Sequence, residues 1–594
     1  MTTLVPKYDQ GATGAVNRPI NEKLAETVSV KDFGALGNGV ADDAAAIQLA
    51  FSSGKSVYFP DGSYLMSSQV TATNDNICVD FGNATIINNN TGGWIFAFGT
   101  SGDTFQSTGL RITGGNFTQA NPATTTGSNF IYIKAIKDFS VKNTILNNVG
   151  NGGICVEAGA ESGVIDNVTI NGRTAYSVCR GIWLQGATAS DFSTQYVDTN
   201  SITRNATPFP VYAVKDVKIV NCTVIVPNYG IYLMNAWNCV IDNCYVDTSG
   251  VGSTRCIAVN NYSPGTRVTN CTLISDRSCT GILITQCSDN VIVANNIFKG
   301  SFGGNRAVYV QYLAKAFITN NQFTDLTTQN IEVNMGGFAH IKNNEFVRIT
   351  KTNDHRAVYF NAIDPASVGT AIGSTGTVLV GSGVIFEGNL LDHVCLGVYS
   401  NTAFAASNGN EPAPEFLQVT DNTFINYDLA TTSSERPLTL GAGASGNNIN
   451  LRFERNVLYP YTTAYKNSPN INGTDYILEC TTNTMALFRV EVITAGGAIT
   501  VAKQAGNNFS CTASRSGANL VLTPRSQLGT SGASVPSLVS ITNENGLITP
   551  HTYTVVRSAN NYVISAYNSA GAAISFATAG ITFNVLFGPL ATGT

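Results

Sequence analysis

The sequence has few charged residues and few methionines. Only 12% of its 594 residues are Asp, Glu, Lys or Arg, and it contains 5 Met but 57 Gly. This composition does not describe an average helical or α/β chain and indicates an all-β protein. The formal net charge of −5 gives no basic surface for nucleic acid or an anionic membrane. With 43% hydrophobic residues, the chain still has ample material for a large core.

Several motifs are also absent. The 13 cysteines include no Cys-x-x-Cys pair, so free and mostly buried thiols are expected rather than a zinc ribbon or a disulfide scaffold. The N-terminus lacks the pattern of a signal peptide, and no run of about 18 apolar residues occurs, so we expect cytoplasmic synthesis and no membrane insertion. Clusters of adjacent Asp are not evident, and we expect no metal and no cofactor.

A short window with the consensus Ile-x-Asn-Asn-x-Phe recurs along the chain. Examples are IVNCTV from Ile219, IDNCYV from Ile241, VTNCTL from Val268, VANNIF from Val293, ITNNQF from Ile318 and IKNNEF from Ile341. The core period is about 22 to 29 residues, with longer steps that indicate insertions. Because Asn tolerates a left-handed backbone bend, each window predicts a strand, a turn and a second strand.

A third short strand follows about 12 residues later in each repeat. Examples are GIWLQ from Gly181, GIYLM from Gly230, CIAVN from Cys256, GILIT from Gly281, AVYVQ from Ala307 and NIEVN from Asn330. Three strands per repeat without intervening helices predict a parallel β-helix, in which equivalent positions stack about 4.8 Å apart. The fourth window position therefore predicts a ladder of Cys222, Cys244, Cys271, Asn296, Asn321, Asn344, Asn389 and Asn422.

The N-terminal region carries a second motif. The stretch NRPINEKLAETVSVKDFGALGNGVADDAAAIQLAF from Asn17 predicts a short helix at residues 41–52, with Asp42 and Asp43 in its first turn. It is followed by VYFPDGSYL from Val57. In these residues the chain resembles phage tailspikes and capsule depolymerases with a pectate-lyase-like, right-handed β-helix. With the repeats, the resemblance covers residues 17–460.

The resemblance implies a homotrimer on a phage tail that acts at the host cell surface. Residues 1–27 would attach it to a tail or baseplate protein, and residues 28–65 would begin the β-helix and cap it. The β-helix is expected at 66–465, with loop insertions at 187–212, 363–381, 402–415 and 428–447. Longer β-rich runs at 475–594 predict a β-sandwich for trimerisation or carbohydrate binding.

A β-helix has no interior pocket, so a long polymer must lie along an outer face. The outward column of the third strand reads Cys155, Trp183, Tyr232, Ala258, Leu283, Tyr309, Glu332, Tyr359 and Tyr399. Two residues further on, the column reads Glu157, Gln185, Met234, Asn260, Thr285, Gln311, Asn334, Asn361 and Asn401. Aromatic rings beside amides suit a sugar chain, although packing against a loop or a neighbouring subunit is the alternative.

Arginines precede this strand on several coils. They are Arg180, Arg255, Arg306 and Arg356. A row of guanidinium groups could hold the carboxylates of an acidic polysaccharide, whereas the alternative is that they pair with turn carboxylates. The predicted sugar-binding residues are thus Tyr309, Tyr359, Tyr232, Gln311, Asn334, Asn361, Arg306, Arg356 and Trp183.

Glu332 is the first candidate for catalysis, because it is the carboxylate flanked in this column by Tyr309 and Tyr359. Burial beside two rings would raise its pKa toward the range of a general acid. Glycoside hydrolysis needs a second carboxylate, about 5 Å away for retention or about 6.5 to 9.5 Å for inversion. The candidates are Asp325, Asp354 and Asp364, and weaker ones are Asp191, Asp198, Glu387 and Asp392.

The resemblance, together with the candidate acids, predicts a tailspike that depolymerises O-antigen or capsule by endo-glycosidic hydrolysis. Two alternatives stay open. A polysaccharide lyase would act by β-elimination beside the arginines, and a receptor fibre would bind polysaccharide without cleaving it. No Gly-x-Ser-x-Gly motif supports an esterase.

Overall fold

The structure is a computed structural model of the chain. It describes residues 6–90, 92–99, 107–120, 128–172, 179–186, 195–197, 203–205, 213–249, 254–275, 279–286, 288–300, 302, 306–324, 326, 330–334, 337–347, 356–362, 383–400, 415–427, 438–440, 449–460, 486–492, 499–505, 509–516, 519–526, 536–546, 552–558, 561–567, 572–574 and 581–590. Side chains of some strand residues, among them Arg356 and Asn361, are not described. The chain forms two compact units, one of Met1–Val358 with Ile363–Val384 and one of Tyr359–Ala362 with Ile385–Thr594.

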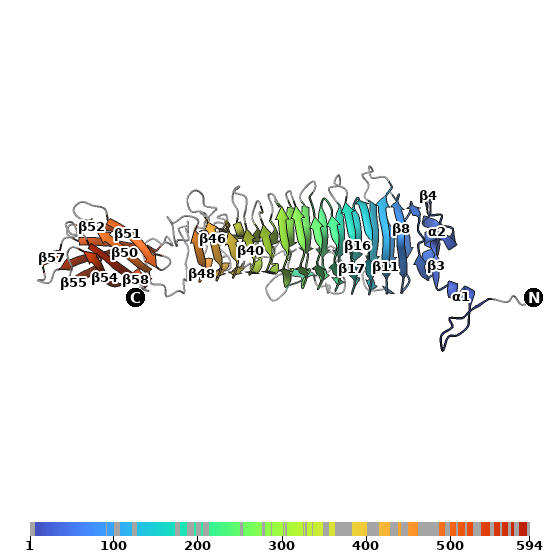
Figure 1. The fold of residues 1–594 in the computed structure, drawn as a ribbon, viewed down its shortest axis with the longest axis horizontal. Coiled ribbons are helices and arrows are strands. Elements are labelled where there is room, and N and C mark those ends of the chain that lie inside the picture. Colours follow the sequence, from blue (N-terminus) through green and yellow to red (C-terminus); the bar gives the residue numbers. More distant parts are fainter. Residues whose placement is uncertain are drawn as a thin grey trace, which may run out of the picture. The chain divides into compact units, whose positions relative to one another are not determined.

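The first unit is a parallel β-helix whose coils each add one strand to three sheets (Figure 1). The first sheet contains β14 (Ser140–Lys142), β17 (Val164–Asp166), β23 (Lys218–Val220), β27 (Val240–Asp242), β30 (Arg267–Thr269), β33 (Val291–Ala294), β36 (Lys315–Thr319) and β39 (Phe338–Lys342). The second contains β15 (Ile145–Val149), β18 (Thr169–Gly172), β24 (Thr223–Ile225), β28 (Tyr245–Asp247), β31 (Thr272–Ser275), β34 (Ile297–Gly300), β37 (Gln322–Thr324) and β40 (Glu345–Val347).

The third sheet is built from the strands that follow each window. In this unit it contains β7 (Val70–Ala72), β9 (Gly93–Gly99), β12 (Ser128–Lys134), β16 (Gly152–Glu157), β19 (Arg180–Gln185), β25 (Tyr229–Met234), β29 (Thr254–Asn260), β32 (Cys279–Ile284), β35 (Val308–Val310) and β38 (Ile331–Asn334). The parallel β-helix expected from the repeats is therefore confirmed.

The asparagines of the windows turn the chain between the first and second sheets. Eight of them have positive φ between 51° and 58°: Asn143, Asn167, Asn221, Asn243, Asn270, Asn295, Asn320 and Asn343. Asparagine reaches this left-handed region at lower cost than most residues, which explains its place in the repeat.

The fourth window position forms the expected ladder. The side chain of Asn296 donates to Asn321 Oδ1 at 3.0 Å, and that of Asn321 donates to Asn344 Oδ1 at 2.9 Å. The backbone amide of Cys271 joins the same series by donating to Asn296 Oδ1 at 2.9 Å. Because each buried amide finds its partner one coil further along, the ladder satisfies groups that water cannot reach.

Apolar side chains fill the interior of the coils. The isoleucines and valines that begin the windows, such as Ile219, Ile241 and Ile318, are fully buried. Phe323 stacks between Phe298 and Phe346, with ring centroids 4.7 Å apart on each side. This distance equals the spacing of hydrogen-bonded strands, so the rings stack in register with the coils.

The predicted helix begins later than expected. Residues Asn38–Asp42 form the strand β4, and the helix α2 spans Ala44–Ser52, so neither aspartate lies in its first turn. The buried carboxylate of Asp43 instead accepts the backbone N–H groups of Leu36 and Gly37 at 2.7 and 3.1 Å. Asp43 therefore serves as the acceptor for these backbone N–H donors, rather than interacting with the helix dipole from the first turn of α2.

Before α2, the first unit holds short elements. They are β1 (Lys7–Tyr8), β2 (Arg18–Pro19), α1 (Ile20–Leu24), β3 (Thr27–Ser29) and a 3₁₀ turn at Val30–Phe33. The first coils contain β5 (Ser56–Tyr58), β6 (Ser63–Met66), β8 (Cys78–Asn88), β10 (Ser107–Thr108) and β11 (Arg111–Gln119).

In the described chain, no helix is both long and apolar enough to cross a membrane.

The second unit contains further parallel coils and an antiparallel region. The coils include β43 (Leu390–Asp392), β44 (Cys395–Ser400), β45 (Glu415–Thr420), β46 (Thr423–Tyr427), β47 (Leu438–Leu440), β48 (Ile449–Glu454) and β49 (Val457–Pro460). Two antiparallel sheets follow, with strand orders β51-β50-β58-β54 and β52-β53-β56-β55. These strands are β50 (Ala486–Val492), β51 (Ile499–Ala505), β52 (Phe509–Ser516), β53 (Asn519–Ser526), β54 (Pro536–Gly546), β55 (Thr552–Ser558), β56 (Asn561–Tyr567) and β58 (Ile581–Leu590). The sandwich and the trimer stay predictions.

Candidate functional site

The outward column of the third sheet has the register expected from the sequence. Paired positions run in succession through Tyr132, Cys155, Trp183, Tyr232, Ala258, Leu283, Tyr309 and Glu332. The second column pairs Lys134, Glu157, Gln185, Met234 and Asn260. One face of a single sheet thus presents aromatic, amide and charged side chains along one line.

A cluster of two arginines and three aromatic residues occupies β19, β25 and β29. We call it the arginine–aromatic cluster, and its members are Arg180, Trp183, Tyr229, Tyr232 and Arg255. The guanidinium carbon of Arg180 lies 3.9 Å from the Trp183 ring centroid, which is a cation–π contact. The rings of Tyr229 and Tyr232 meet edge to face at 5.2 Å, so the five side chains hold one another in place.

Glu332 lies further along the same face, in contact with Arg306, Tyr309 and Asn334. Glu332 is only 1% exposed. Its Oε2 atom accepts a hydrogen bond from Arg306 Nε within an ion pair, and Oε1 accepts one from Asn334 Nδ2 at 2.7 Å. The same Asn334 nitrogen donates to the Tyr309 hydroxyl at 2.7 Å. Arg306, Tyr309 and Asn334 thereby fix the carboxyl group in one position.

Burial raises the pKa of Glu332 above its usual range, because the charged form loses solvation. The charge of Arg306 and the hydrogen bonds from Arg306 and Asn334 oppose that rise. Burial also raises the pKa of Tyr309 to about 12, and the neighbouring charge of Glu332 adds to this. Tyr309 is therefore a neutral hydroxyl at physiological pH, while Glu332 is shifted toward the protonated acid.

A second carboxylate lies at the other end of the face. Glu157 accepts a hydrogen bond from the Tyr132 hydroxyl and lies 3.4 Å from Lys134 Nζ. The ring of Tyr132 also lies 5.5 Å from that of Trp94. Among the described strands of the third sheet in the first unit, Glu157 and Glu332 are the carboxylates, and they lie on β16 and β38. Six strand spacings separate β16 from β38, which is roughly 29 Å. The two carboxyl groups are therefore too far apart to act on one glycosidic bond.

Arg306 pairs with a carboxylate of its own face. Its Nε atom donates to Glu332, and binding of a substrate carboxylate by Arg306 stays a prediction. The row of arginines is also interrupted, because Tyr229 separates Arg180 from Arg255 and Thr280 follows Arg255.

Several predicted residues lie outside the described part of the chain. Asp325, Asp354, Asp364, Asp191 and Asp198 belong to this group. Arg356 and Asn361 lie in β41 (Arg356–Ala362), where their side chains are not described, and Tyr359 is half-buried in the same strand. Gln311 directly follows β35 and is half-buried. The pairing of a second carboxylate with Glu332 stays a prediction.

Two residues of this face were missed in the sequence. Tyr132 lies in β12, one strand before the series of repeats that the sequence motif revealed. Tyr229 occupies the arginine position of its coil, directly before Gly230. The alternation of apolar and polar residues in FIYIK from Phe130 indicates the first of these strands. The first tyrosine of NYGIYLM, from Asn228, indicates the second residue.

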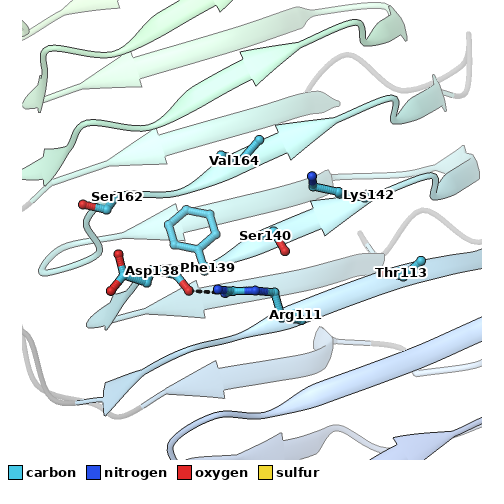
Figure 2. A pocket seen from close by; sticks show the side chains of 8 residues that line it. All are labelled: Arg111, Thr113, Asp138, Phe139, Ser140, Lys142, Ser162 and Val164. Atoms are coloured by element: carbon cyan, nitrogen blue, oxygen red, sulfur yellow. Dashed lines mark hydrogen bonds between the residues drawn. The ribbon is translucent and has the colours of Figure 1, made fainter.

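A separate hollow lies over the first sheet, beside β11, β14 and β17. Figure 2 shows its lining side chains, which are Arg111, Thr113, Asp138, Phe139, Ser140, Lys142, Ser162 and Val164. Arg111 donates to the backbone carbonyls of Leu110 and Asp138, and Lys142 lies 3.8 Å from Asp166. Because both cations already have partners, the hollow is a weaker candidate site than the third sheet.

Comparisons with known proteins agree with this architecture. Residues 27–254 match a family model described as rhamnogalacturonase A/epimerase, pectate lyase-like, and residues 193–346 match one for a right-handed β-helix region. A segment of 62 residues is 40% identical to the tail spike protein of an Escherichia phage. The chain has a pectate-lyase-like, right-handed β-helix and is similar to phage tailspikes. The matched segment is 10% of this chain and 8% of the phage protein.

Solved structures that resemble this chain include two tailspike proteins and a module of an epimerase. The Dettilon tailspike protein is 12% identical, with a TM-score of 0.44 over 98% of this chain and 97% of that one. The tailspike protein of E. coli bacteriophage HK620, solved as a variant in complex with a pentasaccharide, is 10% identical, with a TM-score of 0.46 over 98% and 97%. The A-module of a mannuronan C-5 epimerase from Azotobacter vinelandii is 12% identical, with a TM-score of 0.38 over 76% and 100%.

Proposed function

We propose that the protein is a phage tail component that binds a bacterial surface polysaccharide, O-antigen or capsule, along the third sheet and depolymerises it. One observation carries the proposal: the outward column places Trp183, Tyr232 and Tyr309 in register with the buried acid Glu332. Sugar rings stack their apolar faces on aromatic planes, and their hydroxyls hydrogen-bond to neighbouring amides. A linear face of this kind suits an extended polymer rather than a small ligand.

The reaction that this site favours is endo-glycosidic hydrolysis, with Glu332 as the general acid. A raised pKa favours the protonated acid, which can donate its proton to the leaving glycosidic oxygen. Arg306 and Asn334 hold the carboxyl group in place and stabilise the carboxylate that remains after proton transfer. The partner carboxylate that activates water or attacks the sugar is proposed among Asp325, Asp354 and Asp364.

Polysaccharide lyase activity is the second candidate, and the Tyr132–Glu157 pair favours it. Glu157 lies on β16, the strand next to β19, which carries Arg180 and Trp183 of the arginine–aromatic cluster. Tyr132 lies one strand further away, on β12. In β-elimination, a base removes the proton next to a uronate carboxylate. The bond to the glycosidic oxygen then breaks and leaves a double bond in the sugar. Arginine next to the base would stabilise the negative charge that develops on the carboxylate.

The site requires that the protein be presented to the bacterial surface. We propose a homotrimer on the phage tail, attached through residues 1–27 to a tail or baseplate protein. The exposed apolar side chains of Val16 and Leu24, 76% and 72% exposed, lie in this segment and suit burial against a partner.

The test is to incubate the purified full chain with surface polysaccharides of candidate hosts and to analyse the products. New reducing ends without ultraviolet-absorbing unsaturated ends would support hydrolysis, whereas unsaturated ends would support elimination. Polymers that are bound but remain at full length would overturn both reactions in favour of a receptor fibre.

The matched variants are Glu332→Gln and Glu345→Gln. Glu345 lies in β40, in the second sheet of the next coil and away from the proposed binding face. We expect Glu332→Gln to lower kcat by at least about a hundredfold, the usual range for a general acid, and Glu345→Gln to leave it unchanged. A folded Glu332→Gln variant that cleaves at the parent rate would overturn the assignment of Glu332.

A further inference from the structure

Two guanidinium groups on the third sheet have no carboxylate partner among the residues that the structure describes. In the described chain, Arg255 donates from Nη1 to the Tyr229 hydroxyl at 2.7 Å, and Arg180 makes cation–π contacts alone. Two other described cations of this face differ, because Arg306 pairs with Glu332 and Lys134 Nζ lies 3.4 Å from Glu157 Oε2. The arginine–aromatic cluster therefore carries two positive charges that no described side chain neutralises.

The two guanidinium groups are held in place by the neighbouring rings. Arg180 lies 3.9 Å from the Trp183 ring centroid and 5.7 Å from that of Tyr232. Arg255 lies 5.4 Å from the Tyr229 ring centroid. Stacking limits the rotation of both side chains, so a ligand would bind them at a reduced cost in conformational entropy.

Several polar atoms around the cluster are buried and have no hydrogen-bond partner in the described chain. They are Nε of Arg180, Nε of Arg255, Nε1 of Trp183, Oε1 of Gln185 and Oδ1 of Asn260. Three of these groups are donors, and donors without partners are costly where water is excluded. Both the charges and the donors thus favour an anionic, hydrogen-bonding ligand.

The register gives the dimensions of the cluster. Arg180 pairs with Tyr229, and Tyr229 pairs with Arg255, so the two arginine backbones are two strand spacings, roughly 9.6 Å, apart. Trp183 and Tyr232 are paired three residues further along the same strands. A sugar ring of several ångströms can therefore rest on the aromatic residues while its charged substituent reaches a guanidinium group.

We propose that the arginine–aromatic cluster is a subsite for an acidic sugar, whose anionic group, a carboxylate or a phosphate, binds Arg180 and Arg255. The inference rests on the proposed function and specifies its substrate class: the polysaccharide is acidic. Guanidinium groups bind carboxylate and phosphate in a bidentate manner, which separates these ligands from neutral sugars. The subsite binds and orients the polymer, and the reacting bond lies elsewhere on the face.

The test uses purified bacterial polysaccharides that contain uronic acid, phosphodiester groups or no charge, immobilised and probed with the full chain. We expect acidic polymers to bind and neutral ones not to. Carbodiimide–borohydride reduction of the uronic acids removes the carboxylate, and hydrofluoric acid removes phosphodiesters. The treatment that abolishes binding identifies the anionic group.

The variants are Arg180→Gln and Arg255→Gln, with Arg267→Gln as the control. Arg267 is exposed on β30 in the first sheet. Each cluster variant should weaken binding of the acidic polymer at least about tenfold, and the control should not. Arg180→Lys keeps the charge but loses the planar fork, so it should lie between the wild type and Arg180→Gln.

The outcomes separate this inference from the proposed hydrolysis. Binding that survives removal of every anionic group, or that is unchanged in both glutamine variants, overturns the subsite even if the protein cleaves the polymer. Binding that needs the anionic group and both arginines supports the subsite even if the polymer is not cleaved.

Discussion

The side-chain amide of Asn334 lies 2.7 Å from Oε1 of Glu332, and both residues belong to strand β38. Side chains two residues apart on a strand point to the same face, so a local pair of residues holds the acid. Asn334 favours the charged form of Glu332, whereas burial favours the neutral form. The protonation of Glu332 is thus set by a balance that substitutions can shift in a known direction.

Replacing Asn334 with Leu should raise the pKa of Glu332 further, because the charged carboxylate loses a hydrogen-bond donor. The rate kcat/KM falls on the alkaline side where Glu332, as the general acid, loses its proton. This fall should then move to higher pH. Measuring cleavage of the polymer between acidic and alkaline pH tests this, with Glu345→Gln as the control. A fall that stays in place would mean that another group governs it.

Glu332 should also make stability depend on pH. Its pKa in the folded chain is raised above the ordinary value of 4.5, so the folded protein holds this proton more tightly than the unfolded chain. The contribution is present below the ordinary pKa and is lost as the pH rises toward the folded pKa. Denaturation midpoints of the wild type should fall relative to those of Glu332→Gln across this window. Parallel profiles would contradict the raised pKa.

Replacing Phe323 with Ala should remove the middle ring of the stack with Phe298 and Phe346. The loss of a fully buried phenylalanine and the cavity that it leaves should cost about 3–5 kcal/mol. Phe317 is the matched control, because it lies in β36 of the same coil and is 39% exposed. Chemical denaturation should show a much smaller effect for Phe317→Ala, and equal effects would contradict the stacked core.

Replacing Asn321 with Ala should interrupt the amide ladder. The side chain donates to Val293 O and to Asn344 Oδ1, both at 2.9 Å, and accepts the backbone N–H of Asn296. Because these groups are buried, the free energy of unfolding should fall by about 2–4 kcal/mol. Gln322→Ala changes the next residue, which is exposed, and should have little effect on the denaturation midpoint.

Replacing Asp43 with Ala should destabilise the first coils. Two backbone N–H groups, those of Leu36 and Gly37, would lose their buried acceptor, at a cost of about 1–3 kcal/mol. The effect should appear as faster hydrogen exchange of amides in the segment around α2. Asp61→Ala, at an exposed position, is the control, and similar exchange in the two variants would contradict this role.

Much of the fold was predictable because its rules are local. A window such as ITNNQF contains its own strands and its own left-handed Asn, so the turn at Asn320 forms wherever that pattern occurs. The outward column through Trp183, Tyr232 and Tyr309 followed from the same repeat. The start of α2 was not predictable, because Asp43 accepts backbone amides six and seven residues earlier rather than capping the helix.

The repeated pattern of apolar, polar and Asn positions is enough to predict a solenoid, because it places the same chemistry on every coil. Which charged side chains meet depends on how the coils stack. Arg306 and Glu332 are 26 residues apart, and their contact depends on the register between successive coils. That register leaves Arg180 and Arg255 among aromatic rings, with no carboxylate partner in the described chain, although all these arginines occupy the same position of the repeat in the sequence. Electrostatic pairing acts across space, and only the stacking of the coils creates those neighbours.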